Sequence, residues 1–255
     1  MKTKEELLDI LDFVANYATY MQGSGVHTSR TLRCTQRIGV SQDVEILFST
    51  FQKTMILSVY ERESRETVSR VLPIPTLPIS FTRNTDLGAL SWDSIDENLT
   101  LEEIKTRFNA LIQKPRGNPY FLLIAVGLAN ASFCRLFGGN LSAMAIVFVS
   151  TLLGFSIKQK LQAKGINHYL IFILSAFAAS LCASISLLLD CTSEIALATS
   201  VLFLVPGVPL INGVIDIVEG HVLIGFSRLI NAFLLVVCLA IGLSATLMLV
   251  KDGIV

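Results

Sequence analysis

The segment from Glu194 to Glu219 constrains the fold most, because it is long enough to cross a bilayer but cannot do so as one regular helix. Pro206 and Pro209 each lack an N–H group and each crowd the preceding turn, and a glycine between them loosens the backbone further. The sequence therefore predicts a break in this segment, with one half-helix from Ile195 to Leu204 and a second from Leu210 to Val218.

The same segment carries polar groups where a membrane helix normally has none. Asn212 and Asp216 lie one turn apart, and an ionisable side chain at membrane depth costs roughly 2.5–3.5 kcal/mol on insertion scales. The backbone groups freed around Gly207 must also be buried in protein or turned toward a water-filled cavity. Such features are typical of a transport site. The alternative is a proline-kinked packing helix whose Asp216 reaches the membrane interface.

The composition is that of a membrane protein. Hydrophobic residues make up 52% of the 255 residues, charged residues 16%, and the mean hydropathy is +0.63, which is too apolar for an ordinary soluble domain. Most charged residues lie within residues 1–116, so the two parts of the chain face different solvents. We therefore expect an integral membrane bundle of five α-helical spans with a broken fourth helix, preceded by a small cytoplasmic α+β domain. The charged start of the chain has no apolar signal segment and should stay in the cytoplasm.

Residues 1–116 are expected to form the α+β domain. Apolar residues recur at helical spacing from Glu5 to Met21, and a second helix is predicted from Thr28 to Ile38. Thr100 and Glu103 form a capping box that begins a further amphipathic helix. Partial alternation predicts a meander of three strands, followed by a connecting segment that carries Arg83 and Asp86; the strands are Asp43–Thr50, Lys53–Tyr60 and Ser64–Leu72.

The second helix carries a basic stripe. Arg30, Arg33 and Arg37 share one helical face through their spacing of three and seven residues. The stripe is interpreted as a solvated face, and the alternatives are a contact with anionic headgroups or with a partner subunit. His27 has no nucleophile beside it in sequence, and the Gly-x-Gly pattern just before it is not followed by a phosphate-binding pattern, so we expect a surface histidine.

Residues 117–255 are expected to form the transmembrane domain. The predicted spans are about 119–137, 141–157, 169–189, 195–218 with its break, and 222–250. Asn118 and Pro119 have the pattern of an N-cap followed by a first-turn proline. Small residues spaced by four on the third span allow close helix packing on two adjoining rows, Ser175, Ala179 and Ala183 on one and Ala176, Ser180 and Ser184 on the other.

Positive charge predicts the orientation of these spans. The basic residues Lys114, Arg116, Lys158, Lys160 and Lys164 would all lie on one side of the membrane, which places the N-terminal domain inside and the C-terminus outside. Arg228 lies about two turns into the fifth span, where its charge should meet a carboxylate or the transport pathway. Asp216 is the expected partner. The alternative is that Arg228 reaches the inner headgroups.

Several stretches resemble the threonine/serine exporter family. The main one is LVPGVPLINGVIDIVEGH, from Leu204 to His221, which matches the family pattern of a proline-glycine-x-proline turn followed by an asparagine and then an aspartate. Further support comes from ANASFCRLFGGN at Ala129–Asn140, from GSGVHTSR at Gly23–Arg30 and from RNTDLGAL at Arg83–Leu90. The chain is most similar to the two-subunit, YjjP-like branch, in which a second five-span protein supplies the other half.

The resemblance implies export of small carboxylates across a bacterial inner membrane, succinate for the two-subunit branch and threonine or serine for the fused branch. By position it implies six substrate-binding residues: Pro206, Gly207, Pro209, Asn212, Asp216 and Arg228. One departure concerns the N-terminal pattern, in which an acidic residue usually follows the glycine-rich turn. Here the stretch from Gly25 to Thr28 contains no acid, so a role for that acid is not carried over.

Two other function classes compete with transport. A membrane-anchored ligand sensor or scaffold would use the helices only as an anchor, and the broken span with its polar residues argues against that. A membrane hydrolase would need a nucleophile and a base at one depth, whereas His168 and His221 both lie at span ends. The five cysteines are odd in number and lack a CxxC pair. We therefore expect no enzyme activity, no cofactor or metal, and no nucleic-acid partner.

Overall fold

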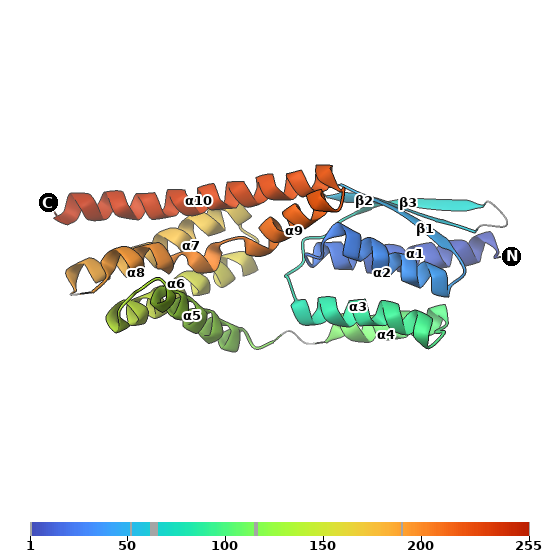
Figure 1. The fold of residues 1–255 in the computed structure, drawn as a ribbon, viewed down its shortest axis with the longest axis horizontal. Helices are drawn as coiled ribbons and strands as arrows, with labels where there is room; N and C mark the ends of the chain where they lie inside the picture. Colours follow the sequence, from blue (N-terminus) through green and yellow to red (C-terminus); the bar gives the residue numbers. More distant parts are fainter. Residues whose placement is uncertain (1, 52, 62–65, 115–116, 190, 255) are drawn as a thin grey trace. The chain divides into compact units, whose positions relative to one another are not determined.

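The computed structural model describes residues 2–51, 53–61, 66–114, 117–189 and 191–254, and it forms two compact units. The N-terminal unit combines residues 1–115 with residues 208–230, and the helical unit combines residues 116–207 with residues 231–255 (Figure 1). Residues from the second half of the broken segment therefore pack with the N-terminal domain. The predicted domain boundary at residue 116 adjoins residues 115–116, which lie outside the described residues.

The N-terminal unit contains the predicted three-stranded meander. Its strands are β1 (Glu45–Thr50), β2 (Thr54–Tyr60) and β3 (Thr67–Pro73), and they pair antiparallel in the order β1-β2-β3. The start of the third predicted strand, at Ser64, lies outside the described residues. The helices of this unit are α1 (Lys4–Gly23), α2 (Thr28–Ser41), α3 (Phe81–Asp96) and α4 (Leu101–Gln113).

Local sequence signals explain most of these helices. The predicted capping box of Thr100 and Glu103 begins α4, and Thr3 with Glu6 forms a second one at α1. The apolar face of α1 enters a core that includes β2 and α4, where Phe13 packs edge-on against Phe108. The buried Tyr17 donates its hydroxyl to the Leu87 carbonyl at 2.6 Å, which joins α1 to α3.

The helix α3 corrects the expected connecting segment at Arg83 and Asp86. Its inward face contains only two large apolar residues, because polar and small residues occupy the other buried positions, namely Asn84, Gly88, Ser91 and Ser94. The apolar residues of this segment are therefore too few to show a helical period, and the sequence pattern does not predict the helix. The buried polar side chains are satisfied locally, since Ser91 and Ser94 each donate to a carbonyl one turn earlier.

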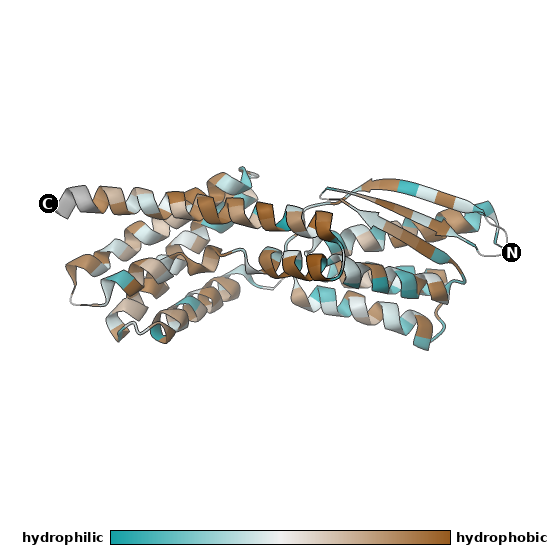
Figure 2. Cartoon of the chain, turned by 45° about the horizontal axis from the view of Figure 1, so that its top comes forward, coloured by the Kyte–Doolittle hydropathy of each residue, from teal (hydrophilic) through white to brown (hydrophobic). Residues whose placement is uncertain are grey.

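The helical unit is built from α5 (Pro119–Leu136), α6 (Leu141–Ala163), α7 (His168–Ala183), the 3-10 helix η1 (Ser184–Leu188), α8 (Ser193–Ser200), the 3-10 helix η2 (Leu202–Leu204) and the later part of α10 (Val222–Ile254). Figure 2 shows hydrophobic residues along these helices, with more hydrophilic colour in α1–α4. The helix α6 extends beyond the predicted end at residue 157, because its final residues form a good helix although they are polar.

Within the described residues, four helices are long and apolar enough to cross a membrane, or up to five if the bent pair Ser193–Leu204 and Gly207–Val218 counts as one span. The two predicted rows of small residues on α7 pack against different helices, one against α6 and the other against α10. A Cβ on Gly154 of α6 would lie 2.8 Å from Ala179, and Ser180 bonds to Thr246 of α10 at 2.7 Å. Close approach of small residues is the usual way in which membrane helices associate.

The predicted break is present, but its second half starts earlier than expected. Val205 and Pro206 separate η2 from α9 (Gly207–Val218), so the prediction that the helix begins at Leu210 is wrong. Pro209 fits in the first turn of α9 because N–H groups there have no intrahelical acceptor.

The break also frees carbonyls at the end of α8. Asn130 of α5 donates to the Thr199 carbonyl at 3.0 Å and to the Thr151 hydroxyl at 2.6 Å, and its side chain is buried. A residue from the ANASFCRLFGGN stretch therefore satisfies the polar groups that the break exposes inside the helical unit.

Candidate functional site

The candidate site lies in the N-terminal unit, where α9 and the start of α10 form a close hairpin. A Cβ on Gly225 would lie 2.6 Å from the Gly213 carbonyl oxygen, so the two backbones approach more closely than side chains would allow. Gly220, in the turn between the helices, has φ +89, a conformation that side chains rarely adopt. The glycines therefore fix how this hairpin presents its polar residues.

Asp216 is fully buried and caps a helix that is far away in the sequence. Its Oδ1 atom accepts a hydrogen bond from the Thr28 N–H at 2.8 Å, at the start of α2. His27 is the N-cap residue of α2, but its own side chain makes no capping bond. The negative charge of Asp216 thus meets the positive end of the α2 dipole, which stabilises a buried carboxylate.

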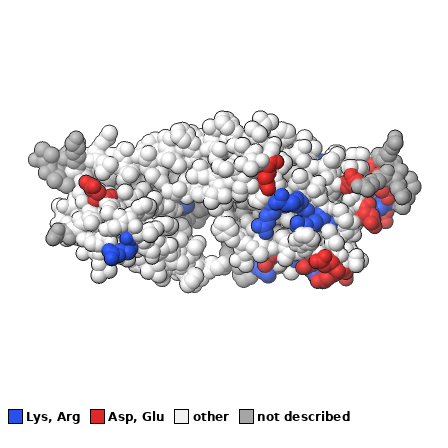
Figure 3. Space-filling model, in the orientation of Figure 1, with Lys and Arg blue, Asp and Glu red and all other residues white. Residues whose placement is uncertain are grey.

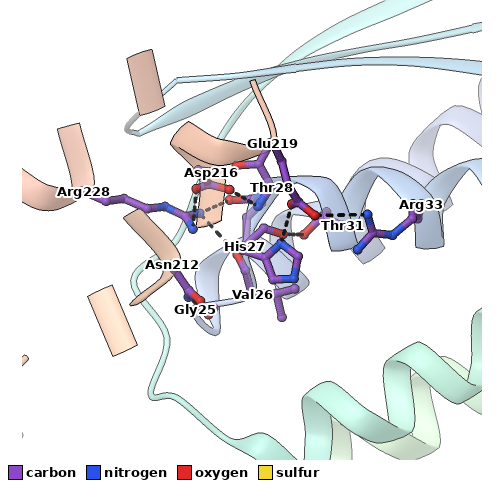
Figure 4. A network of polar contacts seen from close by, with 11 residues as sticks. Gly25, Val26, His27, Thr28, Thr31, Arg33, Asn212, Asp216, Glu219 and Arg228 are labelled. Carbon is purple, nitrogen blue, oxygen red and sulfur yellow. Dashed lines mark hydrogen bonds and ion pairs between the residues drawn. The ribbon is translucent and has the colours of Figure 1, made fainter. Parts of the chain in front are cut away.

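Arg228 of α10 and Asn212 of α9 bind the Gly25–Thr28 turn, which precedes and begins α2 (Figure 4). Arg228 Nη1 lies 2.9 Å from Asp216 Oδ2, and Arg228 Nη2 donates to the Gln22 side-chain oxygen at 2.7 Å and to the Val26 carbonyl at 3.2 Å. Asn212 donates to the Gly25 carbonyl at 2.6 Å. We call this set of residues the Asp216 network; its members are Gln22, Gly25, Val26, His27, Thr28, Asn212, Asp216, Glu219 and Arg228.

The exposed edge of this network joins His27 to Glu219, which follows the last residue of α9. Glu219 Oε2 lies 3.4 Å from His27 Nδ1, and Glu219 Oε1 lies 3.5 Å from Arg33 Nη1. Burial lowers the pKa of His27, although Glu219 and Asp216 act in the opposite direction. A hydrogen bond with Ser29 lowers the pKa of Glu219, with His27 and Arg33 adding to the effect. Glu219 is therefore an anion that can hold α9 to α2.

Polar atoms that lack a hydrogen-bond partner gather in the Asp216 network. They are Gln22 Nε2, His27 Nδ1, Thr28 Oγ1, Asp216 Oδ2 and Arg228 Nη1, all buried. Arg228 Nη1 and Asp216 Oδ2 are close enough for an ion pair, but they are not aligned for a hydrogen bond. His27 Nδ1 likewise has a charged contact, with Glu219 Oε2 at 3.4 Å. Buried polar groups are normally satisfied, so the remaining two atoms, Gln22 Nε2 and Thr28 Oγ1, indicate a place for water or a ligand.

The structure brings together three of the six predicted site residues: Asn212, Asp216 and Arg228. Pro206, Gly207 and Pro209 lie at or just after the break and supply no side-chain hydrogen bond to the network. A Cβ on Gly207 would have open space around it, so close packing does not require glycine there.

Sequence reasoning missed the N-terminal side of the network. His27, expected on the surface, has a side chain only 18% exposed, and Gln22 and Thr28 are buried. Contacts between residues about 190 positions apart leave no local pattern in the sequence. The only sequence signal for these residues was that the GSGVHTSR stretch resembles the exporter family.

Comparison with known families identifies the family to which these segments belong. The pattern of the ThrE family, described as "Putative threonine/serine exporter", matches residues 12–250, which includes both sides of the Asp216 network. The chain belongs to the threonine/serine exporter family. Family membership and the apolar helices together make it a membrane protein.

Two curated proteins are similar to the chain. Both are named "Probable succinate transporter subunit YjjP", one from Klebsiella aerogenes with 36% identity over 148 residues and one from Escherichia coli strain K12 with 35% identity over 147 residues. In each case the match covers 56% of this chain and 57% of the relative. No solved structure matches the chain.

Proposed function

We propose that the chain is one subunit of a secondary transporter that exports a small carboxylate, and that the Asp216 network binds the substrate at the cytoplasmic end of its path. The observation that carries this proposal is the buried ion pair of Arg228 with Asp216, beside which Gln22 Nε2 and Thr28 Oγ1 lack a hydrogen-bond partner among the described residues. Arg228 Nη1 and Gln22 Nε2 are donors that a carboxylate can accept from, and a guanidinium suits a carboxylate because it can bind both oxygens.

The charge of Asp216 separates the two substrate classes. A zwitterion such as threonine or serine would place its carboxylate on Arg228 and its ammonium group on Asp216 Oδ2. A dicarboxylate such as succinate would gain from Arg228 but would be repelled by Asp216 unless that group took a proton or stayed paired. The relatives' names favour the dicarboxylate, and the family description favours the amino acids.

The topology that we propose rests on a parity argument. His27 and Glu219 lie 3.4 Å apart within one unit, so they belong on the same side of a membrane. A chain that starts and ends on the same side must cross the membrane an even number of times. Between His27 and Glu219 in the sequence, α5, α6 and α7 would supply three crossings. We therefore count the bent pair of α8 and α9 as the fourth crossing. With α10 this gives five spans, and the positive charge near Lys114 favours a cytoplasmic N-terminal unit.

The length of α10 supports the same arrangement. Its 33 residues extend about 50 Å, whereas the hydrocarbon core is about 30 Å thick. Residues 231–254 alone are long enough for one crossing, whereas the fourth crossing needs α9 as well as α8, although residues 208–218 of α9 pack with the N-terminal unit. The turn between α9 and α10 would then be cytoplasmic, and the Asp216 network includes residues on both sides of this turn, Asp216 and Arg228.

A second membrane subunit completes the proposal. Many secondary transporters place the substrate between two repeats of opposite topology, and five spans would provide only one of them. The relatives are named as subunits, which agrees with a partner. Export of a dianion from an inside-negative cell gains roughly 4.6 kcal/mol per 100 mV, so no nucleotide site is needed.

The test is efflux from host cells in which this gene is deleted and then restored, because the native partner is present there. Cells are loaded with labelled succinate, threonine or serine, and the membrane abundance of the protein is measured in parallel. We expect restoration to increase efflux of one substrate class. With Asp216→Asn, amino-acid efflux should fall about tenfold or more, whereas dicarboxylate efflux should stay near normal and change its pH dependence. Equal efflux of all three compounds from deleted and restored cells would instead favour a sensor or scaffold.

A further inference from the structure

A second polar feature of the N-terminal unit lies outside the Asp216 network. It is a cleft of about 390 Å³ between α2 and α3, which we call the arginine cleft. Figure 3 shows Lys and Arg atoms gathered in a patch on the face that carries α2. The cleft is lined by Arg30, Arg33, Cys34, Arg37, Thr85, Gly88, Ala89 and Trp92. All three arginines of the basic stripe therefore meet in one place.

Neutral groups hold two of these arginines. Arg30 Nη2 donates to the Asn84 carbonyl at 3.2 Å, and a Cβ on Gly88 would lie 2.8 Å from that Nη2 atom, so glycine makes room for the guanidinium. Arg37 stacks over the Trp92 ring at 3.8 Å and donates to the Ser91 hydroxyl at 3.2 Å. No carboxylate among the described residues pairs with Arg30 or Arg37.

Arginines held in this way repel one another and leave their charge available. A solvated surface stripe would have long, unrestrained side chains, whereas here stacking, hydrogen bonds and a glycine fix two guanidinium groups before any anion arrives. Such preorganisation reduces the entropy that a ligand must overcome on binding. Arg33 is different, because its side chain is 52% exposed and its carboxylate partner Glu219 lies at the loose distance of 3.5 Å.

We propose that the arginine cleft binds a small organic anion with two carboxylate groups, separately from the Asp216 network. Arg30 and Arg37 would hold one carboxylate, and Arg33 would turn from Glu219 to the other. The choice of a dicarboxylate rests on the proposed export function. Since Glu219 also contacts His27, binding in the cleft would weaken the tie between α9 and α2, so the cytoplasmic anion would loosen the Asp216 network.

The chain provides its own reporter for this proposal. Trp92 is the single tryptophan of the chain and lies in the cleft under Arg37, so its fluorescence responds to what binds there. The full-length protein is purified in discs of uncharged lipid and titrated with succinate, with acetate and with inorganic phosphate. Repeating the titration after adding anionic lipid tests whether a headgroup occupies the cleft instead.

We expect a saturable fluorescence change with succinate and a response to acetate at least about tenfold weaker. Arg30→Gln and Arg33→Gln should each weaken succinate binding about tenfold. The matched control is Arg70→Gln, because Arg70 is also about half exposed but lies on β3, outside the cleft. Thermal unfolding of each variant verifies that it is folded, and the exposed Arg33 provides a safe variant if Arg30→Gln unfolds.

Three results would overturn the proposal: no saturable change with succinate, an unchanged affinity in both arginine variants, or an equal response to phosphate. A change that appears only with anionic lipid would assign the cleft to headgroups and would also overturn it. The experiment needs no transport, so its failure leaves the efflux test intact. Conversely, an absence of efflux together with succinate binding would refute the exporter while retaining the cleft.

Discussion

At the scale of single residues, the central feature is that one carboxylate serves two partners. A buried Asp216 is costly unless it is paired and hydrogen-bonded, and it has both the α2 N-terminus and Arg228. The two partners use different oxygens of the carboxylate, because Oδ1 accepts the Thr28 N–H while Oδ2 lies 2.9 Å from Arg228 Nη1. A substrate that takes Arg228 therefore leaves Asp216 still stabilised by α2.

His27 gives this site a dependence on pH. Burial lowers its pKa in the folded protein below the ordinary value of 6.5, so the unfolded chain takes up a proton first as the pH falls. The stability associated with a neutral His27 is thus complete above about pH 6.5 and is lost as the pH falls through that value. Glu219, whose pKa is also lowered, loses its contribution only below its ordinary value of 4.5.

We predict that the thermal unfolding midpoint of the purified protein falls by a few degrees between pH 7.5 and pH 5.5, and that His27→Gln reduces this fall. His221→Gln is the control, since His221 lies beyond the turn and makes no ion pair among the described residues. An identical fall in the wild type and in His27→Gln would mean that another group controls the acid response.

At the scale of helices and strands, prediction from sequence succeeded where the signal was local. The capping box of α4, the meander and the long apolar helices all depend on neighbouring residues, and each is present. The helix α3 was missed because its buried face is largely polar, and the start of α9 was misplaced because Pro209 is compatible with a first turn. The pair of Asp216 and Arg228 was predicted, but its docking on the Gly25–Thr28 turn was not.

The α9–α10 hairpin leads to a prediction about glycine. Gly225→Ala should destabilise the protein by about 1–3 kcal/mol, because a Cβ there meets the Gly213 carbonyl oxygen at 2.6 Å and the Ile217 backbone nitrogen at 2.9 Å, neither of which is a flexible side-chain end. Gly207→Ala is the matched control in α9, with open space around the new Cβ. Thermal unfolding of both variants is the measurement. Equal midpoints would show that the hairpin is not closely packed.

At the scale of the whole molecule, the proposed five-span topology requires that the Gly25–Thr28 turn and the α9–α10 turn lie on the same side of the membrane. Cys34 is a poor reporter of this because it is buried. We predict that cysteines introduced at the exposed positions Gln36 and Val222 react with a membrane-impermeant reagent only after permeabilisation, whereas one at Leu141 reacts in intact cells. Opposite labelling of Gln36→Cys and Val222→Cys would contradict five spans.

The most direct test of the central claim, that Arg228 binds the substrate carboxylate, is efflux from host cells that carry Arg228→Lys. Lysine keeps the charge but loses the bidentate geometry, so we predict that efflux falls about tenfold at normal protein abundance. Arg135→Lys is the control, since Arg135 donates to the nearby Gly139 carbonyl in the helical unit. Full efflux by Arg228→Lys and also by Arg228→Gln, at normal abundance, would contradict this claim and place the substrate site elsewhere.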